Sequence, residues 1–133
     1  MKFVIDEIEV QMCVTYVAGR TTVGTIKGIW HDAAAPVIGQ DYHVELSIYE
    51  PVDVEISDTK RSAKQCPSTH FDGENVVFQG ICEDTDDAVY YVRFDLDWLE
   101  MIECKALAVL YKKGEFISIS ARYYFIEIYP YTL

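Results

Sequence analysis

Hydrophobic and polar residues alternate along most of this chain, and the longest alternating run lies between residues 42 and 56. Apart from Glu50, its even positions are apolar or nearly so, whereas its odd positions are mainly polar and acidic. The even set is Tyr42, Val44, Leu46, Ile48, Val52, Val54 and Ile56. Side chains on a strand point to alternate faces, so the run predicts a strand with one buried face and one acidic face in solvent. Pro51 predicts a bend or bulge within it, because proline cannot donate to a ladder.

Shorter runs predict a hairpin before this strand. Residues 8–16 alternate, residues 18–20 form a turn, and residues 23–30 return as the second arm. Gly24 and Gly28 lie on the same face of that arm, where their missing side chains leave room for a bulky neighbour.

The second half of the chain predicts two more hairpins. Residues 76–82 and 88–96 form one of them, and residues 106–111 and 116–129 form the other. The alternation of the final arm changes parity near Arg122, as a β-bulge would cause.

One short helix and two loops complete the expected elements. The four residues from Asp97 to Glu100 match a capping box, so a helix is expected at 97–104. Residues 31–40 predict a loop, and residues 58–74, which contain few apolar side chains, predict a long surface loop.

These elements predict a mostly β fold of six to seven strands with one short helix. Sequential hairpins make neighbouring strands antiparallel, and such strands form a partly open barrel or a curved sheet around one core. The length of 133 residues suits a single β-rich domain over residues 1–133. An exposed edge strand could also pair with a second copy to form a homodimer.

The charge balance narrows the choice of partners. The chain has 22 acidic and 11 basic side chains, a net charge of -11. Such a surface repels phosphate backbones and anionic membranes and attracts basic proteins, so neither nucleic acid nor membrane is expected as a partner. Acidic residues interrupt the apolar N-terminal stretch before a secretory signal could form, and no CxxC pair is present. We therefore expect a cytoplasmic protein with free thiols.

The spacing of potential metal ligands argues against a metal site. Cys66 and His70 lie four residues apart, and Cys82 or Cys104 could complete a zinc site in space. Structural zinc usually uses two tight ligand pairs, whereas this chain offers one loose pair. The acidic run at 84–87 lacks the glycine and the distal glutamate of a calcium loop. The sequence predicts neither a metal nor another cofactor.

Catalytic motifs are also absent from the sequence. No GxSxG nucleophile or glycine-rich phosphate loop is present, and none of the histidines has a recognisable partner motif. The three histidines are His31, His43 and His70. No catalytic residue is therefore predicted.

Acidic residues and tyrosines predict a protein-binding surface instead. The ten tyrosines offer large, rigid contact areas with a polar tip. Acids collect in groups at 41–55, 83–87 and 95–103, which a sheet could bring together as an anionic patch edged by tyrosines. The expected contact residues are Glu45, Asp53, Glu55, Glu83, Asp84, Asp86, Asp87 and Tyr91.

One stretch resembles a group of known proteins. Trp30, Pro36, Gly39, Tyr42, Val44, Glu45 and Leu46 follow a W…P..G..Y.VEL pattern. The pattern resembles one in small uncharacterised bacterial β-rich proteins, some of which are similar to immunity proteins that neutralise toxins of neighbouring cells. The resemblance covers only residues 30–46 and transfers no functional residue.

The sequence thus predicts a non-enzymatic, acidic protein-binding module. Its leading form is an immunity-type inhibitor that occludes a basic partner such as a nuclease toxin. Two alternatives remain open: a small-ligand-binding β-barrel with an aromatic pocket, and an enzyme whose site is assembled from scattered acids and a histidine.

Overall fold

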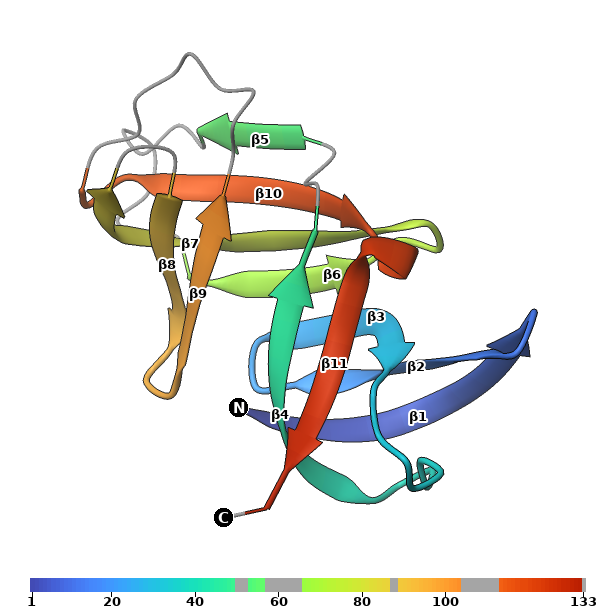
Figure 1. Ribbon diagram of the computed structural model, residues 1–133. Coiled ribbons are helices and arrows are strands. Elements are labelled where there is room, and N and C mark those ends of the chain that lie inside the picture. The colour runs from blue at the N-terminus through green and yellow to red at the C-terminus, as the bar shows by residue number, and fades with distance from the viewer. Residues whose placement is uncertain (50–52, 57–65, 87–88, 104–112, 133) are drawn as a thin grey trace.

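The computed structural model of this chain describes residues 1–49, 53–56, 66–86, 89–103 and 113–132 (Figure 1). These residues form an 11-stranded sheet and one short 3-10 helix. A mostly β fold is confirmed, with more strands than the six to seven predicted. The elements are β1 (Lys2–Gln11), β2 (Val14–Thr21), β3 (Gly24–Trp30), β4 (Asp41–Ile48), β5 (Asp53–Ile56), β6 (Ser68–Phe71), β7 (Asn75–Asp86), β8 (Val89–Asp95), β9 (Trp98–Glu103), β10 (Phe116–Arg122), the 3-10 helix Tyr123–Phe125 and β11 (Ile126–Tyr131).

Five of the strands close into a barrel. Strands β1, β2 and β3 follow one another as hairpins, and β4 returns beside β1, so the spatial order β4-β1-β2-β3 is a Greek key. Strand β11 pairs antiparallel with β4 and parallel with β3, which closes the ring. The predicted barrel is confirmed, and it is closed rather than partly open.

Closure of the barrel depends on a close approach of β11 to Gly28. A Cβ atom on Gly28 would lie 2.7 Å from the carbonyl oxygen of Ile126. Just beyond, the amide of His31 donates to the carbonyl of Ile128 at 2.9 Å. The expectation of a bulky neighbour beside Gly28 is confirmed.

Apolar side chains of the barrel strands fill its interior. The fully buried ones are Phe3, Ile5, Val17, Ile26, Val44, Ile126 and Ile128. They belong to one contiguous hydrophobic cluster that also includes Phe78, Phe94 and Trp98 from outside the barrel. One core therefore runs through both parts of the described structure.

The remaining strands extend the sheet beyond β3. Strand β6 continues from β3, and β7, β10 and β5 follow in that order. Strands β8 and β9 form a separate arm that starts from β7 and descends beside β4 in Figure 1. No helix in the described part of the chain has the length and hydropathy that crossing a membrane requires.

The first hairpin turns earlier than predicted. Its turn lies at Met12 and Cys13, whose φ angles are 48° and 65°, as a two-residue hairpin turn of the primed type requires. Residues 18–20, predicted as the turn, lie inside β2. Gly19 is needed there because a Cβ atom would stand 1.9 Å from the carbonyl oxygen of Val4. In the sequence alone, a glycine that permits close approach of two strands cannot be distinguished from a turn glycine.

The helix predicted at 97–104 is wrong as far as the segment is described. Strand β9 pairs with β8 along its length, and Trp98 and Ile102 are buried on its inward face. Cross-strand pairing and burial of these side chains outweigh a local capping signal. Glu100, the third position of the capping box, lies inside the strand, and residue 104 lies outside the described residues.

Two further predictions are corrected in part. Residues 68–71, expected within the loop at 58–74, form β6, and most of the earlier part of that loop lies outside the described residues. The break near Arg122 is present, but a 3-10 turn at Tyr123–Phe125 makes it instead of a bulge. Strand β10 pairs with β7 and β5, and its predicted partner, residues 106–111, lies outside the described residues.

Candidate functional site

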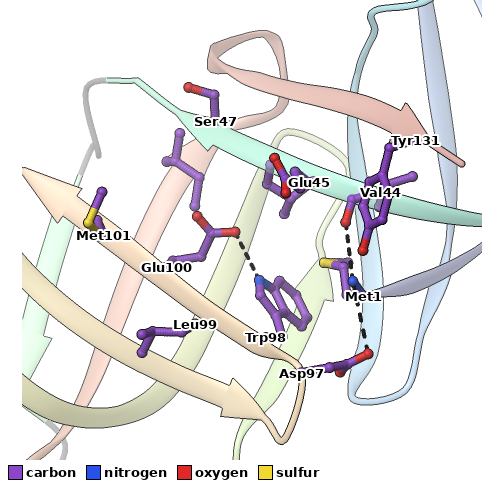
Figure 2. A pocket seen from close by; sticks show the side chains of 12 residues that line it. Met1, Val44, Glu45, Ser47, Asp97, Trp98, Leu99, Glu100, Met101 and Tyr131 are labelled. Atoms are coloured by element: carbon purple, nitrogen blue, oxygen red, sulfur yellow. Dashed lines mark hydrogen bonds and ion pairs between the residues drawn. The ribbon is translucent and has the colours of Figure 1, made fainter. Parts of the chain in front are cut away.

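A cleft of about 390 Å³ lies between β4 and β9, where the arm meets the barrel (Figure 2). Residues 44–48 of β4 form one wall, and residues 97–101 form the other. Met1 and Tyr131 lie at the end nearest the barrel. The fold therefore brings together two segments that lie about fifty residues apart in the sequence.

Both acidic and apolar side chains line the cleft. The carboxyl groups of Glu45, Asp97 and Glu100 line it. Its apolar lining consists of Val44, Leu46, Ile48, Trp98, Leu99 and Met101. The exposed lining of the cleft is more polar than apolar, because Val44, Leu46 and Trp98 are largely buried in the core.

Glu100 lies on the inward face of β9, between Trp98 and Ile102. Burial raises the pKa of Glu100 to about 7. A hydrogen bond that Trp98 Nε1 donates to Glu100 Oε1 at 2.9 Å opposes this rise, and the negative charge of Glu45 adds to it. This carboxyl group therefore changes its charge near neutral pH, and a cation entering the cleft would favour the ionised form.

The cation in this lining is the α-amino group of Met1. It donates to the Val44 carbonyl at 3.2 Å and lies 4.0 Å from Asp97 Oδ2. No lysine, arginine or histidine is among the described residues that line the cleft. Three carboxyl groups against one ammonium leave the cleft negative, so a positively charged group is the complementary ligand.

The β4 wall presents an unpaired strand edge. The amide of Val44 donates to the Met1 carbonyl at 2.9 Å, so the backbone groups of Val44 point toward the β1 side. Every second residue of an antiparallel strand points the same way, so the backbone groups of Leu46 and Ile48 also point there. Beyond Val44, no described strand pairs with β4 on this side.

The β9 wall presents a second unpaired edge. Cys82 exchanges both of its backbone hydrogen bonds with the segment just before β10, at 2.8 and 2.7 Å. Val92, opposite Cys82, therefore bonds toward β9, where its partner is Glu100. By alternation, the backbone groups of Leu99 and Met101 point away from β8. Among the described strands, only β8 pairs with β9.

The structure brings part of the predicted contact set near this cleft. Glu45 lies in it. On the outward face of the arm, Asp84 pairs with Tyr91 and Tyr91 pairs with Met101, so these residues form a cross-strand row that ends at the cleft. Asp86 is exposed two residues beyond Asp84. The row places an acid and a tyrosine beside the exposed Met101.

The other predicted contacts lie elsewhere or are already paired. The Arg93 guanidinium donates to Glu83 at 2.8 Å and holds the pKa of that carboxyl below its usual value. Asp53 and Glu55 belong to β5, which β10 and β7 separate from the arm. Asp87 lies outside the described residues.

Glu100 is the cleft residue that sequence reasoning missed as a contact, because the capping box gave it a local role. With a period of two, Trp98, Glu100 and Ile102 share one face of a strand. A carboxyl group between two large apolar residues on that face indicates a candidate binding residue. Leu99 and Met101 are equally apolar, so the alternation alone did not distinguish the inward face from the outward one.

The W…P..G..Y.VEL stretch contains the connection between β3 and β4. Trp30 Nε1 donates to the Ala34 carbonyl at 2.9 Å, and the Trp30 ring meets the Tyr42 ring edge to face at 4.9 Å. Gly39, with φ of 83°, donates its amide to the Ile5 carbonyl at 2.7 Å. These residues of the pattern thus have structural roles here.

The potential metal ligands in the sequence do not form a cluster in the described part of the chain. Among those residues, no group of three or more histidine, cysteine, aspartate or glutamate side chains could hold a metal ion. Cys66 is exposed and Cys82 is buried, both with free thiols, and Cys104 lies outside the described residues.

One histidine has a carboxylate partner. His31 Nε2 lies 3.1 Å from Glu127 Oε2, and the His31 ring stacks on Tyr129 at 4.8 Å. The Tyr129 hydroxyl also donates to Glu127. Such a pair could exchange a proton with a substrate, so it is the natural place to test the enzyme alternative.

Several other aromatic residues surround a lysine on the barrel surface. Lys27 Nζ lies 4.3 Å from the ring centre of Tyr123, 5.5 Å from that of Phe71 and 6.0 Å from that of Tyr16. It also lies 2.6 Å from Glu9 Oε2. This cluster satisfies its own charge and is explained by folding alone.

Comparison with protein families, with curated proteins and with solved structures finds no match. The resemblance over residues 30–46 therefore stays a prediction from the sequence.

Proposed function

We propose that this chain is a non-enzymatic binding module that receives a basic segment of a partner protein in the β4–β9 cleft. The observation that carries the proposal is the gathering of Glu45, Asp97 and Glu100 in one cleft between β4 and β9. The biological form we propose is an immunity-type inhibitor, which occludes the basic groove of an enzyme such as a nuclease toxin.

The chemistry of the cleft favours a lysine or arginine side chain. Its aliphatic stem would lie against the inward face of β9, and its charge would meet Glu45 and Glu100 in a partly desolvated setting. Hydrogen bonds to charged groups contribute about 1.5–3 kcal/mol, more than neutral ones.

Contact outside the cleft would come from the outward face of the arm. Asp84, Tyr91 and Met101 form a continuous row there, and Met101 is 68% exposed. A rigid tyrosine and an exposed methionine beside an acid suit the edge of a protein interface.

A pull-down at low salt, followed by an activity assay, tests this proposal. The tagged chain should retain a basic protein that moderate salt releases, and that protein's enzymatic activity should fall to zero at one equivalent of the chain. Glu45→Lys should weaken retention at least tenfold. Glu7→Lys, the same charge change on β1 outside the cleft, is the matched control. Equal retention by the two variants would remove the cleft from the interface.

The ligand-binding alternative has less support. The barrel strands bury seven large apolar side chains completely, so the interior is filled by the chain itself. A small apolar or sugar-like ligand that raised the melting temperature by several degrees would revive this alternative.

A further inference from the structure

We propose that the partner enters the cleft as an extended strand, which adds to the unpaired edges of β4 and β9 and turns a lysine or arginine side chain to Glu100. This inference rests on the proposed function and deepens it, because it names the conformation and chemistry of the bound segment.

The backbone groups that face the cleft call for a strand. Leu46 and Ile48 on one wall, and Leu99 and Met101 on the other, direct amide and carbonyl groups away from their paired neighbours, as the bonds of Val44 and the register of β9 require. An unpaired edge is a template for another strand, and added strands gain affinity from main-chain hydrogen bonds. A helix offers no free backbone groups to such an edge.

The walls also set the order of side chains on the bound strand. An added strand would turn alternate side chains toward the inward face of the arm and toward solvent. The inward positions meet Trp98 and Glu100, which Figure 2 shows pointing across the cleft toward β4. A segment of alternating basic and apolar residues therefore fits the site.

Charge selects a basic partner over a second copy of this chain. Each copy carries a net charge of -11, and the cleft itself holds Glu45, Asp97 and Glu100 against the single amino group of Met1. A second copy would bring like charges together, whereas a basic strand would neutralise them. Burial and the charge of Glu45 raise the pKa of Glu100, and a basic side chain beside it would favour its ionised form.

The test uses a blocked peptide of alternating valine and lysine, about eight residues long so that it matches one strand. Amide hydrogen exchange of the full chain is followed by NMR with and without saturating peptide at low salt. Exchange at Leu46, Ile48, Leu99 and Met101 should slow at least tenfold. Exchange at Ser47, which already bonds toward β11, should not change.

Two control peptides separate the backbone from the charge. One carries N-methyl groups on alternate amides and keeps every lysine; it should bind at least tenfold more weakly. The other peptide has glutamine in place of lysine. The wild-type chain should bind it more weakly than the lysine peptide, whereas the Glu100→Gln variant should bind the two peptides with equal affinity.

Each contrary result has a distinct meaning. Equal binding of the methylated peptide, or binding without slowed exchange at the four edge amides, would overturn strand addition but leave a basic-segment site intact. Absence of binding by the lysine peptide would overturn this inference, while the pull-down decides the proposed function separately. Slowed exchange of the same amides with rising protein concentration alone would identify a second copy as the occupant and overturn the basic partner.

Discussion

At the scale of residues, Glu100 and Gly28 show how single positions serve different ends. Glu100 is a carboxyl group on the inward face of a strand, at a place where an apolar side chain would stabilise the fold more. Gly28 lacks a side chain at a place where β11 must approach closely. The first position fits a binding role, and the second is explained by packing.

Glu100 should make stability depend on pH. Its pKa rises from 4.5 to about 7 on folding, so between these values the native state binds more protons than the unfolded state. The free energy of unfolding therefore falls as pH rises through this window, by at most roughly 3 kcal/mol. Glu100→Gln should abolish this part of the fall and be more stable than the wild type at about pH 8. Chemical denaturation across the window measures it.

The exposed Glu7 provides the control for that experiment. Glu7→Gln should follow the wild-type pH profile. Parallel profiles for Glu100→Gln and the wild type would mean that Glu100 is solvated in the folded chain.

Gly28→Ala should destabilise the barrel. Its Cβ atom would stand 2.7 Å from the Ile126 carbonyl oxygen and 3.0 Å from Ile126 Cγ2, so the β3–β11 pair must move apart. Overpacking of this kind costs about 1–3 kcal/mol, which denaturant midpoints resolve. Ser118→Ala, a small change at a partly exposed position of β10, should cost less. Equal stability of the two variants would mean that β11 can shift freely.

At the scale of elements, β9 decides what the site can be. As a helix, this segment would satisfy its own backbone groups and present no edge. As a strand paired on one side with β8, it leaves alternate amides facing the cleft.

Amide exchange in the free chain should reveal this alternation. The amides of Glu100 and Ile102 bond to β8 and should exchange slowly, while those of Leu99 and Met101 should exchange much faster. A helix would protect successive amides alike. Uniform protection from residue 99 to residue 102 would contradict the strand, or would place a further strand against its outer edge.

At the scale of the whole molecule, the proposed function assigns different roles to the net charge, which would speed association with a partner, and to the cleft, which would slow its dissociation. A charge of -11 acts over the Debye length, about 10 Å at 0.1 M salt, and steers basic proteins toward the chain. Contacts within the cleft are partly desolvated, and salt screens them less.

Charge reversal on the arm should therefore slow association without changing dissociation. Asp84→Lys with Asp86→Lys should lower the association rate constant with a basic partner several-fold at low salt, and the difference should vanish near about 0.5 M salt. Surface plasmon resonance measures both rate constants. The double reversal Glu7→Lys with Asp32→Lys, at two exposed positions away from the arm, tests whether position matters beyond total charge. An unchanged association rate would remove the arm from the approach path.

Much of the fold could be predicted, because the pattern along each strand is local. The runs at 76–82 and 88–96 predicted the β7–β8 hairpin. The run at 42–56 was predicted as one strand, but residues 42–48 belong to β4 and residues 53–56 form β5, which pairs with β10 in another part of the sheet. The helix at 97–104 was wrong because a four-residue capping signal is weak beside the burial of Trp98 and Ile102. The turn of the first hairpin was predicted at the wrong place, because the role of Gly19 depends on a neighbouring strand.

Only part of the candidate site could be predicted from the sequence. Glu45, predicted as a contact from its place on the acidic face of β4, lines the cleft, and Tyr91 pairs with Met101, which also lines it. Nothing local in the sequence pairs Glu45 with Glu100, because their proximity depends on where the arm lies relative to the barrel.

The sequence by itself determined that this chain forms a β-sheet with an acidic surface, since side-chain alternation and net charge are properties of the chain alone. The tertiary structure decided that five strands close into a barrel and that β9 is a strand. It also decided that an edge of β4 and an edge of β9 face each other across an acidic cleft. Strand pairing joins residues distant in the sequence, and the burial that raises the pKa of Glu100 exists only after those strands have met.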